Sequence, residues 1–121
     1  MSDVQTPVSQ LRQLVADFVA ERDWQQFHSP KNLSMALAIE AAELMEHFQW
    51  ITADDSRNVV DDRDALAAVG DELADVICYA MALANELGLD ISTVVHTKMA
   101  KNVIKYPADE YRGRFGPEDM G

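Results

Sequence analysis

Apolar residues recur at helical spacing in four stretches of the 121-residue chain. These stretches cover residues 8–24, 33–50, 64–87 and 90–105. Within each of them, apolar positions three or four residues apart fall on one face of an α-helix. No stretch shows the alternation that is typical of a strand. The pattern therefore predicts an all-α fold, a four-helix bundle-like protomer.

The ends of these stretches carry residues that are typical of helix termini. Thr6-Pro7 and Ser29-Pro30 each place a capping side chain before a proline, which favours the first helical position. Gly88 is typical of the position that follows a helix, and Asp90 is predicted to cap the fourth helix. The polar segment 52–62 is predicted to be a loop.

The third helix is apolar on nearly every side between residues 73 and 83. One layer of neighbouring helices covers only part of such a surface, so a second subunit is the natural cover. The pattern predicts a symmetric homo-oligomer, a dimer at least. We expect one domain over residues 1–107 and an irregular tail over residues 108–121, which contain three glycines and alternating charges.

Two acidic pairs interrupt the apolar pattern of the second and third helices. Glu40 and Glu43 form one pair, and Glu72 and Asp75 form the other, each with i, i+3 spacing. Residues three apart lie on one helix face, and both pairs border the apolar stripe of their helix. Burying ionised carboxylates is costly unless cations or donors compensate them. The pairs therefore favour a divalent cation between the helices, with partly solvated surface acids as the alternative.

The chain is strongly acidic, with a net charge of −11 at pH 7. That charge argues against binding to nucleic acid polymers or to anionic membranes, which favour basic surfaces. No window is apolar enough to span a membrane, and the N-terminus does not resemble a secretion signal. The single cysteine, Cys78, lies in an apolar run and is predicted to be a small buried hydrophobe. These features predict a soluble cytoplasmic protein.

The fourth helix ends in a mostly basic face formed by Lys98, Lys101, Asn102 and Lys105. In an acidic chain this is the one local positive cluster, and lysine is a suitable partner for phosphate. The same lysines could instead offset the negative end of the helix dipole. The face is therefore a candidate phosphate-binding surface.

Three segments, residues 40–50, 71–79 and 98–107, together resemble a known family. They are similar to the all-α nucleoside triphosphate pyrophosphohydrolases of the MazG-like superfamily. Residues 21–33 resemble its dCTP pyrophosphatase branch more closely, and the likeness extends over about residues 8–116. The ordered set of motifs carries the resemblance, because a single acidic pair would be weak evidence.

The resemblance implies Mg²⁺-dependent hydrolysis between the α- and β-phosphates, which yields a nucleoside monophosphate and pyrophosphate. It implies that Glu40, Glu43, Glu72 and Asp75 bind the metal, and it leaves open which of them holds the attacking water. It also implies a dimer of dimers. The substrate-binding positions that it implies are Lys98, Asn102, Lys105 and Tyr106 beside the phosphates and sugar, Tyr79 at the sugar, and Trp24, Phe27, His28 and Trp50 near the base.

The chain departs from that branch at Val15, a position where the branch has histidine. This departure counts against cytosine and leaves the base preference open, with dCTP, from the rest of the resemblance, as the leading substrate. His47, one turn beyond Glu43, is either a partner of the carboxylates or an exposed residue.

Other functional classes predict different behaviour. A non-catalytic helical interaction module would carry the same acids as surface charge and would show no metal dependence. A carboxylate-bridged di-iron or di-manganese bundle needs Glu-x-x-His motifs, which the chain lacks. A phosphoribosyl-ATP pyrophosphohydrolase would share the carboxylates but should differ around residues 24–32.

Overall fold

The computed structural model describes residues 1–114, and these residues form helices joined by short turns, with no strand among them. The chain divides into two compact units, one that ends at Leu89 and one that begins at Asp90. The elements of the first unit are α1 (Val8–Glu21), η1 (Gln25–Phe27), α2 (Pro30–Glu46), α3 (Ala53–Arg57), η2 (Asn58–Asp61) and α4 (Arg63–Leu87). The second unit contains α5 (Ile91–Lys105) and α6 (Ala108–Tyr111). The predicted all-α fold class is confirmed.

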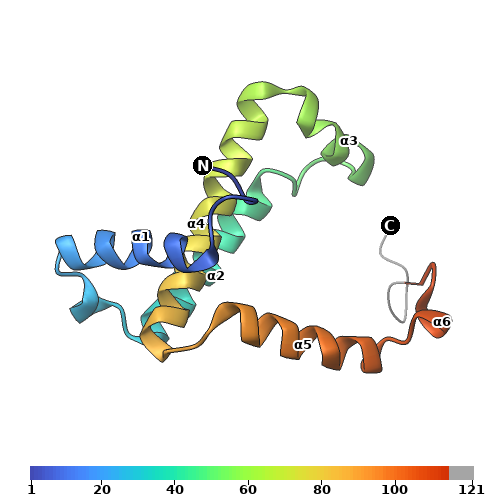
Figure 1. Cartoon of the computed structure of the whole chain (residues 1–121). Helices are drawn as coiled ribbons and strands as arrows, with labels where there is room; N and C mark the ends of the chain where they lie inside the picture. Colours follow the sequence, from blue (N-terminus) through green and yellow to red (C-terminus); the bar gives the residue numbers. More distant parts are fainter. Residues whose placement is uncertain (115–121) are drawn as a thin grey trace. The chain divides into compact units, whose positions relative to one another are not determined.

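The 25-residue helix α4 is the element on which the first unit is built. It packs along α2, which runs in the opposite direction, and it also contacts α1 (Figure 1). The core where these helices meet consists of Val19 from α1, Leu33 from α2, and Met81, Ala82 and Ala84 from α4. Small residues on α4 let the neighbouring helices approach it closely. The buried residues of α4 therefore lie in its C-terminal half.

Side-chain caps fix where three of the predicted helices begin. Ser29 accepts a hydrogen bond from the Asn32 amide at 3.1 Å, with Pro30 as the first helical residue. Asp62 accepts from the Ala65 amide, and Asp90 accepts from the Thr93 amide. These bonds satisfy backbone donors that have no partner inside the helix. The predicted caps Ser29 and Asp90 are confirmed.

Gly88 ends α4 in the left-handed conformation, with φ of 65°. Glycine adopts this conformation without the steric cost that a Cβ atom brings, so the chain can turn directly after the helix. The predicted C-terminal stop is confirmed.

Several predicted boundaries are wrong. Helix α1 begins at Val8 with Pro7 as its N-cap, so Thr6 does not cap it, and it ends at Glu21 rather than near residue 24. Asp23 then takes a positive φ of 53°, which turns the chain away from the helix. Helix α2 likewise ends at Glu46, four residues before the predicted end at residue 50. After α1 the apolar spacing continues because the Trp24 ring packs on Phe18, whereas Trp50 after α2 is exposed.

The predicted loop at residues 52–62 is also wrong, because this segment forms α3 and η2. The Thr52 hydroxyl accepts a hydrogen bond from the Asp55 amide at 3.0 Å, and Asp54 and Asp55 lie in the first turn. Acidic residues there interact favourably with the positive end of the helix dipole. The polar composition that suggested a loop therefore stabilises a short helix.

The second unit contains a helix where the sequence predicts an irregular tail. Residues 108–111 form α6, whose Tyr111 ring contacts the Tyr106 ring edge-to-face at 5.2 Å. Residues 115–121 of the predicted tail lie outside the described residues.

A large part of the apolar surface of α4 is not covered by its own chain. Leu73 and Ile77 are 46% and 44% exposed, although Met81 on the same helix is 8% exposed. Cys78 is exposed as well, so its predicted burial is wrong. The part of α4 predicted to be apolar on every side is thus buried only near its C-terminal end. Among the described residues, no helix is both long and apolar enough to cross a membrane.

Candidate active site

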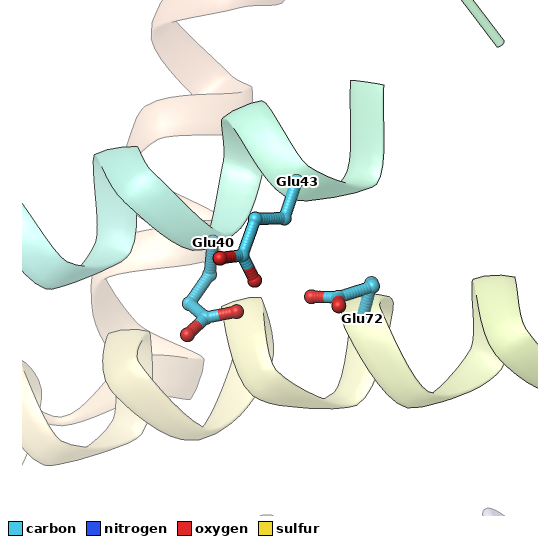
Figure 2. Close-up of side chains that lie close together, drawn as sticks. All are labelled: Glu40, Glu43 and Glu72. Atoms are coloured by element: carbon cyan, nitrogen blue, oxygen red, sulfur yellow. The ribbon is translucent and has the colours of Figure 1, made fainter. Parts of the chain in front are cut away.

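Three of the four predicted metal ligands come together between α2 and α4. Glu40 and Glu43 lie one turn apart on α2, and Glu72 points toward them from α4 (Figure 2). One carboxylate oxygen of each residue lies within 4.8 Å of the others. The i, i+3 spacing puts both α2 acids on the face that meets α4, so the close packing of the two helices brings the three acids together.

The carboxylate cluster formed by Glu40, Glu43 and Glu72 lacks compensating groups. The Oε2 atoms of Glu40 and Glu72 are buried and have no hydrogen-bond partner. Among the described residues, neither ion pair involves a member of the cluster. An unsatisfied buried carboxylate oxygen is costly, so the arrangement is stable only if a proton or a cation compensates the charge.

The raised pKa of Glu40 is consistent with this uncompensated negative charge. The neighbouring Glu43 carboxyl, burial, the Glu72 carboxyl and the charge of Asp75 together raise the pKa of Glu40 to about 7. Crowded like charges favour protonation of one member at the expense of its ionised form. A cation among the carboxylates would remove the same repulsion without a proton.

The residues present fit a divalent cation such as Mg²⁺. Mg²⁺ prefers oxygen ligands, and sites that act on phosphates combine a few carboxylates with substrate oxygens and water. The cluster offers three carboxylates with two buried oxygens that have no other partner. Unpartnered oxygens, and not acidity alone, make this group a candidate metal centre.

Asp75 lies outside the group of three but next to it. It follows Glu72 by one turn of α4, and its charge acts on Glu40. Its side chain also lines a neighbouring cavity of about 440 Å³. Asp75 therefore connects the carboxylate cluster to this cavity.

The walls of the 440 Å³ cavity are mostly apolar and come from α1, α4 and the connection after α1. The Trp24 ring packs edge-to-face on Phe18 at 5.6 Å and lies 6.2 Å from the His28 ring. A cavity of this size with aromatic walls and few polar groups is typical of a small-molecule site. The lining residues are Leu14, Val15, Phe18, Val19, Trp24, His28, Asp75, Cys78, Tyr79 and Ala82.

Three of the predicted substrate-binding residues, Trp24, His28 and Tyr79, thus line one cavity beside the carboxylates. Two other aromatic candidates do not line it: Phe27 is 59% exposed and Trp50 is 87% exposed. His47 is the exposed C-cap of α2. Within the first unit, the structure therefore separates the aromatic candidates into a cavity group and a surface group.

The remaining predicted site residues belong to the second unit. Lys98, Asn102 and Lys105 lie on α5, and Tyr106 is its C-cap. The Lys105 ammonium lies 5.3 Å from the centre of the Tyr106 ring. The role of these residues in substrate binding stays a prediction.

The sequence did not single out every residue that lines the cavity. Leu14 and Phe18 belong to the apolar pattern of residues 8–24, which predicts an inward helix face, yet they are 62% and 47% exposed. Cys78 was placed in the core for the same reason. Apolar periodicity shows which face of a helix turns inward, but it does not distinguish a packed core from a cavity.

An all-α unit with a carboxylate cluster beside an aromatic cavity defines a class of helical proteins with a candidate divalent-metal centre. The model of the MazG-like family matches residues 35–114. That stretch is more than half of the 121-residue chain, and the chain belongs to the MazG-like family. The family resemblance noted from the motifs is confirmed.

Named relatives agree with this assignment. The chain is 42% identical over 103 residues to dCTP pyrophosphatase 1 of Rattus norvegicus, which covers 85% of this chain and 61% of that protein. It is 44% identical over 98 residues to dCTP pyrophosphatase 1 of Homo sapiens, covering 81% and 58%. The chain thus spans about three fifths of the length of these relatives. The crystal structure of a pyrophosphatase from Archaeoglobus fulgidus DSM 4304 is similar, with a TM-score of 0.77 and 33% identity over 88% of this chain and 98% of that one.

Proposed function

We propose that the chain hydrolyses a nucleoside triphosphate between its α- and β-phosphates, with dCTP as the leading substrate and Mg²⁺ as the cofactor. The observation that carries the proposal is the carboxylate cluster with two buried, unpartnered oxygens beside an aromatic cavity. The names of the relatives support the reaction class and the base. The products would be the nucleoside monophosphate and pyrophosphate.

In this mechanism Glu40, Glu43 and Glu72, with Asp75 beside them, would hold the metal. Bound Mg²⁺ would neutralise charge on the phosphates and acidify a water molecule. The chain places no described cation against these acids, so an anionic triphosphate approaches them only when the acids are compensated. One of the four carboxylates accepts the proton of the attacking water.

The bond changes follow in-line displacement at the α-phosphorus. The water oxygen forms a bond to phosphorus while the bond to the oxygen that bridges the α- and β-phosphates breaks. Pyrophosphate leaves with that oxygen, and the proton of the water passes to the carboxylate and then to solvent. The rigid pairing of α2 and α4 keeps the carboxylates in place during this step.

The nucleoside would occupy the 440 Å³ cavity, because Asp75 belongs to both the acidic end and the cavity wall. Trp24 and His28 offer ring faces near the base, and Tyr79 offers a hydroxyl at the sugar. Stacking on aromatic rings contributes about 1–3 kcal/mol per base and selects bases weakly. Lys98, Asn102, Lys105 and Tyr106 would contact the phosphates and sugar. Trp50 does not line this cavity, so the cavity lends no support to its predicted contact with the base.

The same proposal includes a homo-oligomer in the cytoplasm, a dimer or a dimer of dimers. The exposed apolar side chains of Leu73, Ile77 and Trp50 support it, because a partner subunit would remove them from water. Sedimentation at micromolar concentration tests this part separately. A species of only 13.5 kDa would contradict it.

The test of the proposed reaction is product identification. The protein is incubated with dCTP and Mg²⁺, and the nucleotides and phosphates are separated by ion-exchange chromatography. We expect dCMP and pyrophosphate, and no product in excess chelator. Release of dCDP and orthophosphate would contradict the position of cleavage. No product with any of the eight common nucleotides would favour the interaction-module alternative.

A further inference from the structure

A second, smaller cavity adjoins the 440 Å³ cavity at its end away from the carboxylates. Its volume is about 120 Å³, and it shares Val15, Val19, His28 and Ala82 with the larger one. The residues that only the smaller cavity has are Ala16, Gln25, Asn85 and Glu86. The polar side chains of the larger cavity are His28, Asp75 and Tyr79, and the smaller cavity adds further hydrogen-bonding groups that can distinguish one base from another.

One face of α4 runs from Asp75, beside the carboxylate cluster, to the smaller cavity. Asp75, Tyr79, Ala82 and Glu86 follow one another at steps of four, three and four residues, so they lie on one helix face. At about 1.5 Å per residue, Glu86 lies about 16 Å along the helix from Asp75. Side chains on a helix lean toward its N-terminus, which brings the Glu86 carboxylate back toward Ala82. A nucleotide with its phosphates at the acidic end and its base in the larger cavity therefore presents the outer edge of the base to Glu86.

Of the polar groups in the smaller cavity, Asn85 is already used by the fold. The Arg12 Nε atom donates to its Oδ1 atom at 2.8 Å, and its Nδ2 atom donates to the Arg12 carbonyl at 3.2 Å. This reciprocal pair ties α1 to α4 beside the cavity and holds its two walls together. The side chains of Gln25 and Glu86 have no hydrogen bond or ion pair with any other residue in the range 1–114.

We infer that Glu86 reads the outer edge of the base and selects one that bears an exocyclic amino group, cytosine first. The inference rests on the proposed function, and it names the residue that sets the base preference there. A carboxylate only accepts hydrogen bonds, so it pairs with the amino group of cytosine. The keto oxygen of uracil or thymine would face it acceptor to acceptor, and neither group would be satisfied. In this chain, Val15 on α1 stands where the related branch has histidine. The residue that selects the base would then be Glu86 on α4.

The test compares Glu86→Gln with wild type on cytosine and uracil nucleotides. The glutamine keeps the shape of the side chain but can donate through its amide, so it suits a keto oxygen as well as an amino group. Because Glu86 is exposed at the cavity rim, we expect the ratio of kcat/KM for dCTP to that for dUTP to fall about tenfold rather than more. Glu46→Gln removes the same charge from the exposed end of α2, outside both cavities, and should leave the ratio unchanged.

A binding measurement keeps this inference separate from the proposed hydrolysis. Calorimetric titration with dCMP and with dUMP, in the presence of Mg²⁺, measures base selection without turnover. We expect tighter binding of dCMP by the wild type and loss of that preference in Glu86→Gln, with melting temperatures of the variants close to wild type. An unchanged ratio of dissociation constants in Glu86→Gln, or no binding of dCMP by the wild type, would overturn the inference. Absence of pyrophosphate release alongside a preference that depends on Glu86 would overturn only the proposed reaction.

Discussion

The two sides of α4 in the first unit differ in chemistry. Toward α2, α4 presents Glu72 to two further acids, and the buried oxygens there have no partners. Toward α1, the same helix presents Tyr79 and Ala82 to an apolar cavity with aromatic walls. The acidic side costs free energy unless a cation or a proton compensates its charge. The apolar side costs free energy only because it leaves apolar surface in water. The difference indicates that the acidic side is built for charge compensation and the apolar side for a neutral, flat group.

The largest expected effect is on the acidic side. Glu40→Gln, Glu43→Gln, Glu72→Gln and Asp75→Asn each keep the side-chain volume but remove a ligand charge. Changes in groups that only support metal ligands cost about 10–100-fold in activity, so loss of a direct ligand should lower kcat by about 100-fold or more. Steady-state kinetics with dCTP and Mg²⁺ measures this. Glu46→Gln is the control, since it removes a charge from the same helix outside the cluster.

Near wild-type activity in the Glu40 or Glu72 variant would contradict the metal role. It would mean that the carboxylates of the cluster do not hold the metal that the reaction needs. Equal loss of activity in Glu46→Gln would point to the overall charge of the protein instead.

A smaller effect is expected on the apolar side. Trp24→Ala removes a ring face from the cavity, and stacking of a base on an aromatic ring is worth about 1–3 kcal/mol. We therefore expect KM for dCTP to rise about tenfold with a modest change in kcat. Phe27→Ala is the matched control, because Phe27 lies in the same connection but does not line the cavity. An unchanged KM in Trp24→Ala would show that the base lies elsewhere.

The second unit should contribute less than either side of α4. Lys98→Ala removes a proposed phosphate partner, and an exposed charge pair is worth up to about 1 kcal/mol. KM for dCTP should then rise by a factor of about three to five, while kcat changes little. Lys101→Ala removes the same charge one turn further along α5 and should leave KM unchanged. If both variants raise KM equally, the lysines attract the substrate only by their summed positive charge and not by a specific contact of Lys98 with phosphate.

The smallest effect concerns the stability of the metal-free protein. The pKa of Glu40 is about 7 in the folded chain against 4.5 as its ordinary value. A raised carboxyl pKa favours the folded state fully below the unfolded pKa, and this contribution is lost as pH rises through the folded pKa. In chelator, wild type should therefore melt below Glu40→Gln at pH 8, and the two should converge near pH 4.5.

Adding Mg²⁺ at pH 8 should reverse that order of melting temperatures, because only the wild type keeps the full set of ligands. Thermal unfolding followed by circular dichroism measures both conditions. Equal melting temperatures of the two proteins at every pH would show that the crowding of Glu43 and Glu72 around Glu40 has no energetic consequence.

Sequence reasoning predicted the acidic side of the site better than the apolar side. Glu40 and Glu72 could be identified because an acid beside an apolar stripe departs from the local pattern. Such departures are often found at functional sites. Phe18 and Leu14 did not stand out, because an apolar residue in an apolar stripe looks the same in a core and in a cavity. The branch-like aromatic residues Trp24 and His28 were identified only through the resemblance.

Among the fold elements, the long helices were predicted and the short ones were not. The caps Ser29 and Asp90 and the stop at Gly88 act locally, so the sequence shows them directly. Helix α3 depends on Thr52 and its acidic first turn, a pattern that polar loops share. The exposure of Cys78 depends on how α1 and α4 pack, which no local pattern shows.

The most direct test of the central claim is a metal titration of the carboxylate cluster. Mn²⁺, which shares the oxygen ligands of Mg²⁺ and is detected by electron paramagnetic resonance, is added to chelator-treated wild type, Glu72→Gln and Glu46→Gln. The account predicts saturable binding by wild type and Glu46→Gln, and an affinity at least about tenfold lower in Glu72→Gln. Absence of binding by wild type, or equal affinities of all three proteins, would contradict a metal centre between α2 and α4.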